Sequence, residues 1–233
     1  MASARAVAEL DQEYNHVRHI DHPNIVRMVD FKQDGLCAYL FLEWCANGSL
    51  EALIHGDSAT EMKEPRIRSY TKQILTGLKV LHAHNLLHRD IKPGNILVDS
   101  NGTLKLTDFG LSRHETSMTN TQHIAGTRHY IAPEAFNGHF SAGSDIWAVG
   151  CTVVEMATRA RPWSHLDRNL QAHGPLEFHI GNNQGRPFHH PRIPNNLSEE
   201  CKSFLTQCFN GNASHRGTCA SLLESPWFMV EAS

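Results

Sequence analysis

One short segment of the sequence carries a dense set of reactive side chains. Residues 86–98, LLHRDIKPGNILV, contain the carboxylate of Asp90, the ammonium of Lys92 and the carboxamide of Asn95, and a second carboxylate, Asp108, follows closely. A carboxylate can accept a proton, an ammonium can neutralise an anion, and carboxylate and amide oxygens are ligands that hard cations prefer. A single reaction that moves a proton and neutralises negative charge could use this set, provided that the fold brings the groups together.

The sequence around this segment predicts the elements that position it. Between residues 66 and 87, apolar residues recur at three- and four-residue steps, which indicates an amphipathic helix that ends at the segment. The runs NILV and TLKLTD flank Asn101-Gly102, a dipeptide typical of tight hairpin turns. We expect this hairpin to set Asn95 beside Asp108.

The two ends of the chain predict different structures. Residues 2–20 are rich in helix formers, and this helix should stop at His22-Pro23. The β-rich runs NIVRMVDF and LCAYLFLEW are separated by residues 32–35, as in a hairpin with a four-residue loop. From about residue 140 onward the periodicity is mostly helical. A small region of helix and hairpin is therefore expected beside a larger helical one.

The composition restricts the partners and the location of the protein. The 233 residues are 40% hydrophobic and carry a formal net charge of −3 without a block of Lys or Arg, so neither a nucleic acid nor an anionic membrane is expected as the main partner. The longest apolar run, CAYLFLEWCA, is too short to span a bilayer. Because the N-terminus also lacks the apolar core of a signal peptide, we expect a cytoplasmic location. The six cysteines form no C-x-x-C pair and the 17 histidines have no complete ligand set, so we expect reduced thiols and no histidine metal site.

The order of the motifs resembles that of the eukaryotic protein kinases. His88-Arg89-Asp90 with Asn95, then Asp108-Phe109-Gly110 and then Ala132-Pro133-Glu134 follow one another as in this family, and together these motifs are highly specific. The resemblance covers nearly the whole chain. It implies transfer of a phosphoryl group from ATP, with Mg²⁺, to a protein substrate.

The resemblance also implies the roles of the reactive residues. Asp90 would take the proton of the substrate hydroxyl, and Lys92 would place its ammonium beside the transferring phosphoryl group. Asn95 would be the third catalytic residue. It would also hold Mg²⁺ together with Asp108. Each residue alone has a plainer interpretation, such as a turn aspartate or a solvated lysine. Their combination points to phosphoryl transfer.

Binding of the adenine base would involve residues outside the reactive segment. By the same resemblance, the backbone groups of Glu43 and Cys45 would bond adenine, and Leu97 would form an apolar floor. Leu42 would be the gatekeeper residue beside the base. Because Glu43 and Cys45 act through the main chain, most side chains would be tolerated there.

The resemblance extends to the acceptor and to regulation. The lysine two residues after Asp90, Lys92, and the later pair Gly126-Thr127 resemble the pattern of the serine/threonine branch of the family. Arg89 could pair with a phosphate placed on the activation segment by an upstream activating kinase. The candidate acceptors on that segment are Thr116, Ser117, Thr119 and Thr121. Glu134 and Arg216 would form a buried ion pair that braces the same segment.

Two elements of the kinase pattern are missing. The resemblance implies a glycine-rich loop and a strand lysine ahead of a helix carrying Glu13, but the sequence has no G-x-G pair and no lysine before Lys32. The implied fold is therefore α+β and protein-kinase-like, with a truncated N-terminal lobe of one helix and a β-hairpin over residues 1–44 and a mostly helical C-terminal lobe over residues 45–230. Without the missing strands, we expect an unpaired strand edge and an exposed apolar side of the first helix.

Three segments indicate a subgroup of the family. Residues 150–158, 178–181 and 193–209 resemble mitogen-activated protein kinase kinase kinases, although Arg159-Ala160 stand where Gly-Lys is common. The sequence is thus interpreted as a serine/threonine kinase catalytic domain without its first strands, acting in a signalling cascade on a protein substrate such as a downstream kinase. The alternative is a kinase-fold binding or regulatory protein with impaired catalysis.

Overall fold

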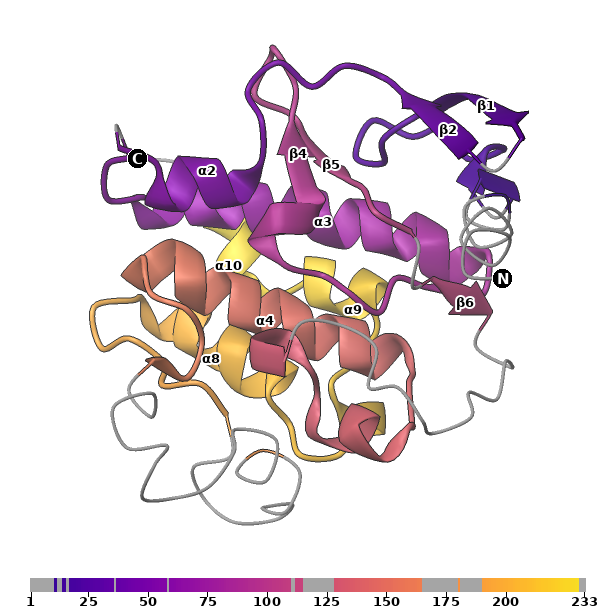
Figure 1. The fold of residues 1–233 in the computed structure, drawn as a ribbon. Coiled ribbons are helices and arrows are strands. Elements are labelled where there is room, and N and C mark those ends of the chain that lie inside the picture. Colours follow the sequence, from indigo (N-terminus) through magenta and orange to yellow (C-terminus); the bar gives the residue numbers. More distant parts are fainter. Residues whose placement is uncertain are drawn as a thin grey trace.

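The described elements combine small antiparallel sheets with a bundle of helices. The computed structural model describes residues 11, 14, 15, 17–35, 37–57, 59–109, 112–114, 128–164, 180 and 190–230. In this part of the chain the strands pair two by two, as β1–β2, β3–β6 and β4–β5 (Figure 1). The elements in chain order are β1 (Met28–Asp34), β2 (Cys37–Leu42), α2 (Leu50–His55), α3 (Glu64–Ala83), β3 (Leu86–Leu87), β4 (Ile96–Val98), β5 (Leu104–Leu106), β6 (Arg113–His114), α4 (Ala142–Thr158), α8 (Glu199–Cys208), α9 (Cys219–Leu223) and α10 (Pro226–Met229). This is the α+β fold that the sequence predicted.

Helix α3 forms where the apolar periodicity predicted a helix. Its buried apolar face includes Ile67, Tyr70, Ile74, Leu78 and Leu81. The helix ends at Ala83 and not at residue 87, because Asn85 takes a left-handed backbone conformation (φ 56°) and Leu86-Leu87 pair with Arg113-His114. The reactive segment therefore begins on a short strand that helical periodicity did not reveal.

The N-terminal hairpin differs from its prediction at the turn. β1 and β2 pair antiparallel with Phe31 opposite Leu40, and residues 32–34, predicted as loop, extend strand β1 instead. The turn starts only at Gly35 (φ 58°), because glycine adopts a positive φ without steric cost. Strand β2 has β1 as its single partner within the described residues, so its other edge is unpaired, as expected.

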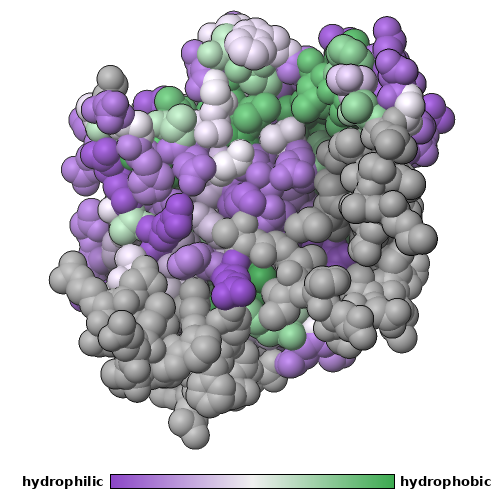
Figure 2. Space-filling view, viewed as in Figure 1, coloured by the Kyte–Doolittle hydropathy of each residue, from purple (hydrophilic) through white to green (hydrophobic). Residues whose placement is uncertain are grey.

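Apolar surface is exposed on this hairpin, whereas the first helix is better covered than predicted. Among the described residues between 11 and 20, the buried side chains are Val17 and Ile20, and the ring of Tyr14 stacks on Phe31 with 5.8 Å between centroids. The expected exposure of the helix is thus wrong at these positions, because they pack into the core. The large apolar side chains that do stay exposed here are Val29, Tyr39, Phe41, Leu42 and Trp44. Figure 2 shows hydrophobic surface in the upper part of the view, where the two hairpins lie.

Hairpin β4–β5 joins the reactive segment to Asp108. Gly102 has the positive φ (82°) that the turn was predicted to need, and the carboxylate of Asp99 accepts two backbone hydrogen bonds of 2.8 Å within the turn. At the open end of the hairpin, the N–H of Thr107 donates to the carbonyl oxygen of Asn95 at 3.0 Å. This bond places Asn95 next to the residue before Asp108, as predicted.

Helix α4 is the centre of the helical region. Its residues from Gly143 to Met156 are buried, and it packs against α3 and α8. Gly150 permits the close approach of α8, because a Cβ atom at this position would lie 2.9 Å from side-chain atoms of Cys208 and Phe209. In the described part of the chain, no helix combines the length and the apolar character that crossing a bilayer requires.

Candidate active site

Three residues of the reactive segment meet at one carboxylate oxygen. Oδ2 of Asp90 lies 2.6 Å from the ammonium nitrogen of Lys92 and 2.8 Å from Nδ2 of Asn95. The same amide nitrogen donates to the backbone carbonyl of Asp90 at 3.0 Å. Because Asp90 is only 7% exposed, these donors stabilise its negative charge in a largely dehydrated position. The structure thus brings together the three residues that the sequence indicated as catalytic.

A buried aspartate holds the backbone of the reactive segment. Asp145, on α4, is 1% exposed, and its carboxylate accepts hydrogen bonds from the backbone N–H groups of His88 (3.0 Å) and Arg89 (2.8 Å). Arg89 has a left-handed backbone (φ 70°), a conformation that persists in a non-glycine residue only when its surroundings hold it. Nε2 of His82, on α3, lies 2.8 Å from the same carboxylate. Helices α3 and α4 therefore set the position of Asp90 together.

His82 and Asp145 are positioning residues to which the sequence analysis assigned no role. The signal in the sequence is a carboxylate directly ahead of the apolar run IWAVGCTVV, because a charge at the start of a buried helix requires partners. The sequence does not reveal which partners these are, since His82 lies far from Asp145 along the chain. Packing of α3 against α4 brings the two side chains into contact.

The His82–Asp145 pair carries charge inside the protein. Burial alone would lower the pKa of His82, but its hydrogen bonds to Asp145 and to the thiol of Cys219 (3.5 Å), together with the carboxylate charge, raise the pKa to about 10. Burial alone would raise the pKa of Asp145, but the hydrogen bond and the charge of His82 hold that pKa below its ordinary value. The imidazolium and the carboxylate therefore stabilise each other at neutral pH.

This pair predicts how stability depends on pH. The contribution of His82 should be complete below about pH 6.5, the ordinary pKa of histidine, and should be lost as the pH rises toward 10. The contribution of Asp145 should be present above about pH 4 and lost as the pH falls below that value. We therefore expect the difference in unfolding free energy between the wild type and His82→Gln, from urea titrations, to be smaller at pH 9.5 than at pH 6 by about 4 kcal/mol.

The matched control is His84→Gln, which changes an exposed histidine at the end of the same helix. This variant should follow the wild-type pH profile. If the effect of His82→Gln stayed constant between pH 6 and pH 9.5, the buried imidazolium would be ruled out.

Asn95 and Asp108 present oxygen atoms that suit Mg²⁺. Because Nδ2 of Asn95 is bound to Asp90, its Oδ1 remains as an acceptor. Within the described residues, neither this oxygen nor the exposed carboxylate of Asp108 has a hydrogen-bond partner. Carboxylate and amide oxygens are the protein ligands that Mg²⁺ uses, and phosphate oxygens and water complete its shell. The two residues therefore fit a Mg²⁺ ion that is bound together with a phosphate.

Histidine and cysteine form no comparable site in the described ranges. No group of three or more His, Cys, Asp or Glu side chains in these ranges is placed to hold a metal ion. Four of the six cysteines, Cys151, Cys201, Cys208 and Cys219, are buried in the helical region, and all six are free thiols.

The backbone at Glu43 and Cys45 is open to a ligand. The side chain of Glu43 is engaged elsewhere, since its Oε1 accepts from the N–H of Arg27 (2.7 Å) and from Nζ of Lys105 (3.0 Å). The carbonyl oxygen of Glu43 and the N–H of Cys45 have no hydrogen-bond partner among the described residues. Leu97, on β4, is half-buried, and burial raises the pKa of the Cys45 thiol, which therefore stays neutral. This stretch offers a donor and an acceptor next to apolar surface, which is what the edge of a purine base needs.

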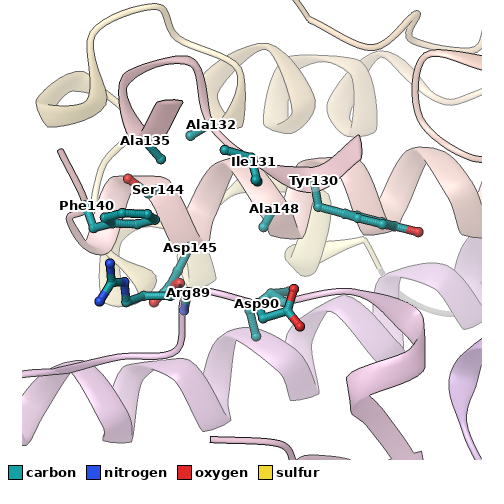
Figure 3. Close-up of a pocket in the computed structure, with 11 residues that line it drawn as sticks. Arg89, Asp90, Tyr130, Ile131, Ala132, Ala135, Phe140, Ser144, Asp145 and Ala148 are labelled. Atoms are coloured by element: carbon teal, nitrogen blue, oxygen red, sulfur yellow. Dashed lines mark hydrogen bonds between the residues drawn. The ribbon is translucent and has the colours of Figure 1, made fainter. Parts of the chain in front are cut away.

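A small cavity lies between the reactive segment and residues 130–135 (Figure 3). Its volume of about 20 Å³ suits a single water molecule and excludes a nucleotide. On one side, the guanidinium of Arg89 lies over the ring of Phe140, 3.8 Å from its centroid. On the other side, the hydroxyl of Tyr130 donates to the buried carboxylate of Glu155, and burial and this carboxylate raise the pKa of Tyr130. The contact between Tyr130 and Glu155 ties residues 130–135 to α4.

The predicted ion pair between Glu134 and Arg216 is confirmed. The guanidinium binds the carboxylate in a bidentate way, with Nη1–Oε1 and Nη2–Oε2 distances of 2.6 and 2.8 Å. Arg216 is 0% exposed and also donates to the carbonyl oxygens of Gly143 (3.0 Å) and Asn210 (2.8 Å). Its guanidinium lies 4.9 Å from the ring centroid of Trp147. The pair therefore fastens Ala132-Pro133-Glu134 to the helical core.

Several predicted residues lie outside the described part of the chain. They are Glu13, Gly110, Gly126, Thr127 and the candidate phosphorylation sites Thr116, Ser117, Thr119 and Thr121.

Known proteins resemble this chain over nearly its whole length. The family description that matches is "Protein kinase domain", over residues 2–228. The chain is 38% identical to "Mitogen-activated protein kinase kinase kinase 1b" of Physcomitrium patens and to "Mitogen-activated protein kinase kinase kinase 3" of Arabidopsis thaliana, and 36% identical to "Mitogen-activated protein kinase kinase kinase A" of Dictyostelium discoideum. These alignments cover 97%, 97% and 96% of this chain but only 28%, 36% and 23% of the respective relatives. The chain thus spans well under half the length of the curated relatives that it matches.

Proposed function

Because the chain belongs to the protein kinase family, we propose that it is a serine/threonine kinase that transfers the γ-phosphate of ATP to a protein substrate. The observation that carries this proposal is the convergence of Lys92 and Asn95 on Oδ2 of Asp90. The relatives are named as mitogen-activated protein kinase kinase kinases, which supports a downstream kinase as the substrate. An upstream activating kinase and a cytoplasmic location belong to the same proposal.

In the proposed reaction, Asp90 accepts the proton of the substrate hydroxyl. Its carboxylate is held by two donors and by the backbone anchored on Asp145, so that it needs little reorganisation when the hydroxyl arrives. Lys92 lies close enough to the base to neutralise charge on a phosphoryl group that reacts at that hydroxyl. Asn95 connects the two halves of the site, because its amide nitrogen holds Asp90 while its oxygen faces a ligand. A bound Mg²⁺ would neutralise part of the negative charge of the phosphates.

The nucleotide would extend from these residues to the hinge between β2 and α2. The Glu43 carbonyl and the Cys45 N–H would bond adenine, Leu97 would pack on the base, and Asp108 would be the second protein ligand of Mg²⁺. This arrangement puts the nucleotide between residues 1–44 and residues 45–230, which we propose as the two lobes.

A kinase-fold binding or regulatory protein is the second candidate function. The observation that favours it is that residues 1–233 contain no G-x-G pair, so that no phosphate-covering loop of this pattern lies within them. Removing one well-placed transition-state donor typically costs on the order of 3 kcal/mol, or 10²- to 10³-fold in rate. We therefore expect these 233 residues by themselves to bind Mg·ATP weakly and to transfer its γ-phosphate slowly.

Substitution of Asp108 tests the proposed nucleotide site. Asp108→Asn should weaken the binding of Mg·ATP about tenfold or more, because it replaces the charged carboxylate ligand of the ion with a neutral amide. Adenosine without Mg²⁺ should bind the variant and the wild type equally, because it needs only the hinge. Both affinities can be measured by calorimetric or NMR titration.

The control variant is Asp57→Asn, which changes an exposed aspartate after α2 and should affect neither ligand. Equal affinity of Asp108→Asn and the wild type for Mg·ATP would refute the metal site. Failure of the wild type to bind either ligand would favour the regulatory protein.

A further inference from the structure

A second cavity lies apart from the reactive segment. It has a volume of about 240 Å³, and its lining residues come from the C-terminal end of α4, from residues 160–164 and from the segment that leads into α8. Its lining is rich in hydrogen-bond donors and includes one aromatic ring. The residues concerned are Thr158, Arg161, Trp163, Ser164, Arg192 and Asn195.

The described residues that line this cavity carry positive charge only. Arg161 and Arg192 are both exposed, and none of the described residues that line the cavity is acidic. Neither guanidinium forms a hydrogen bond or an ion pair within the described ranges. Two arginines at one cavity form a local concentration of positive charge in a chain whose formal net charge is −3, and this suits an anionic ligand.

The backbone that carries Arg161 is held in place by several contacts. Arg159 takes a left-handed conformation (φ 54°) at the end of α4. It stands where the subgroup pattern described above commonly has a glycine. Its Nε donates to the carbonyl oxygen of Ile54, the penultimate residue of α2, at 2.9 Å. The N–H of Ser164 donates to the carbonyl oxygen of Arg161 at 3.1 Å. The loop is thus preorganised, which lowers the entropic cost of binding a ligand.

We propose that this cavity binds a phosphate monoester carried on a side chain of a protein or peptide. Guanidinium groups bind phosphate in a bidentate way, and hydroxyl and amide donors such as Ser164 and Asn195 can contact its remaining oxygen atoms. A phosphate monoester carries nearly two negative charges at neutral pH, so it can satisfy both arginines. A single carboxylate carries one negative charge and has fewer oxygen atoms than the donors here could use.

The position of the cavity suggests what presents the phosphate. Arg161 also lines a groove beside α2, whose wall includes Glu51 and His55. Glu51 lies against the reactive segment, since a Cβ atom on Gly94 would be 3.1 Å from its Oε2. A polypeptide that runs from Asp90 along this groove could therefore place a phosphorylated residue at Arg161. Binding at the cavity does not depend on catalysis, so it can be tested apart from the proposed kinase activity.

The experiment uses the whole chain and the peptide Ac-Ala-phosphoserine-Ala-amide. The readout is the NMR signal of the indole N–H of Trp163, which is assigned by its absence in Trp163→Phe. We expect a saturable shift of this signal with the phosphopeptide at pH 7.5. The double variant Arg161→Ala/Arg192→Ala should bind about tenfold more weakly or worse. The control Arg18→Ala/Arg27→Ala, which removes two exposed arginines and therefore gives the same change in net charge, should bind like the wild type.

Other probes separate the possible results. Inorganic phosphate binding as tightly as the phosphopeptide would show a site for free phosphate and would overturn the role of a protein side chain. Equal binding of Ac-Ala-Asp-Ala-amide would overturn the choice of phosphate over carboxylate. A shift that does not saturate, or that survives in the double variant, would refute the site itself. Neither arginine belongs to the proposed nucleotide site, so none of these results bears on the Asp108→Asn test.

Discussion

Asp90→Asn is expected to reduce the rate of phosphoryl transfer by roughly 10²- to 10⁴-fold, the typical contribution of a general base. An amide cannot take the proton of the substrate hydroxyl. Its oxygen can still accept the hydrogen bonds that Lys92 and Asn95 donate to Oδ2, so the loop should keep its shape. The rate should be measured on a serine peptide, in a chain to which a glycine-rich loop and a strand lysine have been added ahead of residue 13.

Binding measurements separate a catalytic role of Asp90 from a structural one. The affinity of Asp90→Asn for Mg·ATP should stay within about twofold of the parent chain, because Asp90 contacts no metal in the proposed site. Asp57→Asn, in the exposed turn after α2, should retain the full rate. A rate above about one tenth of the parent value for Asp90→Asn would be incompatible with a general base at this position.

Arg216→Ala should be the most destabilising single substitution among those considered. It leaves the Glu134 carboxylate without its bidentate partner and removes the donors to the carbonyl oxygens of Gly143 and Asn210. Breaking a buried ion pair from one side typically costs 3–5 kcal/mol. For a chain of this length, the expected fall in the midpoint of thermal unfolding is roughly 10 °C. Thermal and denaturant unfolding both measure this effect.

Two further variants serve as reference points for the stability loss of Arg216→Ala. Lys202→Ala removes an exposed pair with Glu199 (2.8 Å), and it should change stability by no more than about 0.5 kcal/mol. Arg216→Lys keeps the charge but loses the planar fork, so its stability should lie between those of the wild type and Arg216→Ala. A loss of less than about 1 kcal/mol in Arg216→Ala would mean that the ion pair does not brace the helical region.

Local sequence predicted the parts of the fold that depend on neighbouring residues. The apolar spacing between residues 66 and 87 identified α3, and Asn101-Gly102 identified the turn of β4–β5 with its positive φ at Gly102. Where long-range pairing intervened, the predictions were wrong. α3 stops at Ala83 because Leu86-Leu87 pair with residues 113–114, and β1 continues through residues 32–34 because β2 supplies partners.

For the candidate site, the sequence by itself determined which groups are present, and the tertiary structure decided how they act together. Motif order singled out Asp90, Lys92, Asn95 and Asp108, because the distances along a short loop and hairpin limit where these side chains can lie. The charged state of His82 and its contact with Asp145 depend on two helices packing together, since burial and partners set a pKa. The same holds for Arg161 and Arg192, which are separated in sequence and line one cavity only because α4 and the segment before α8 fold against each other.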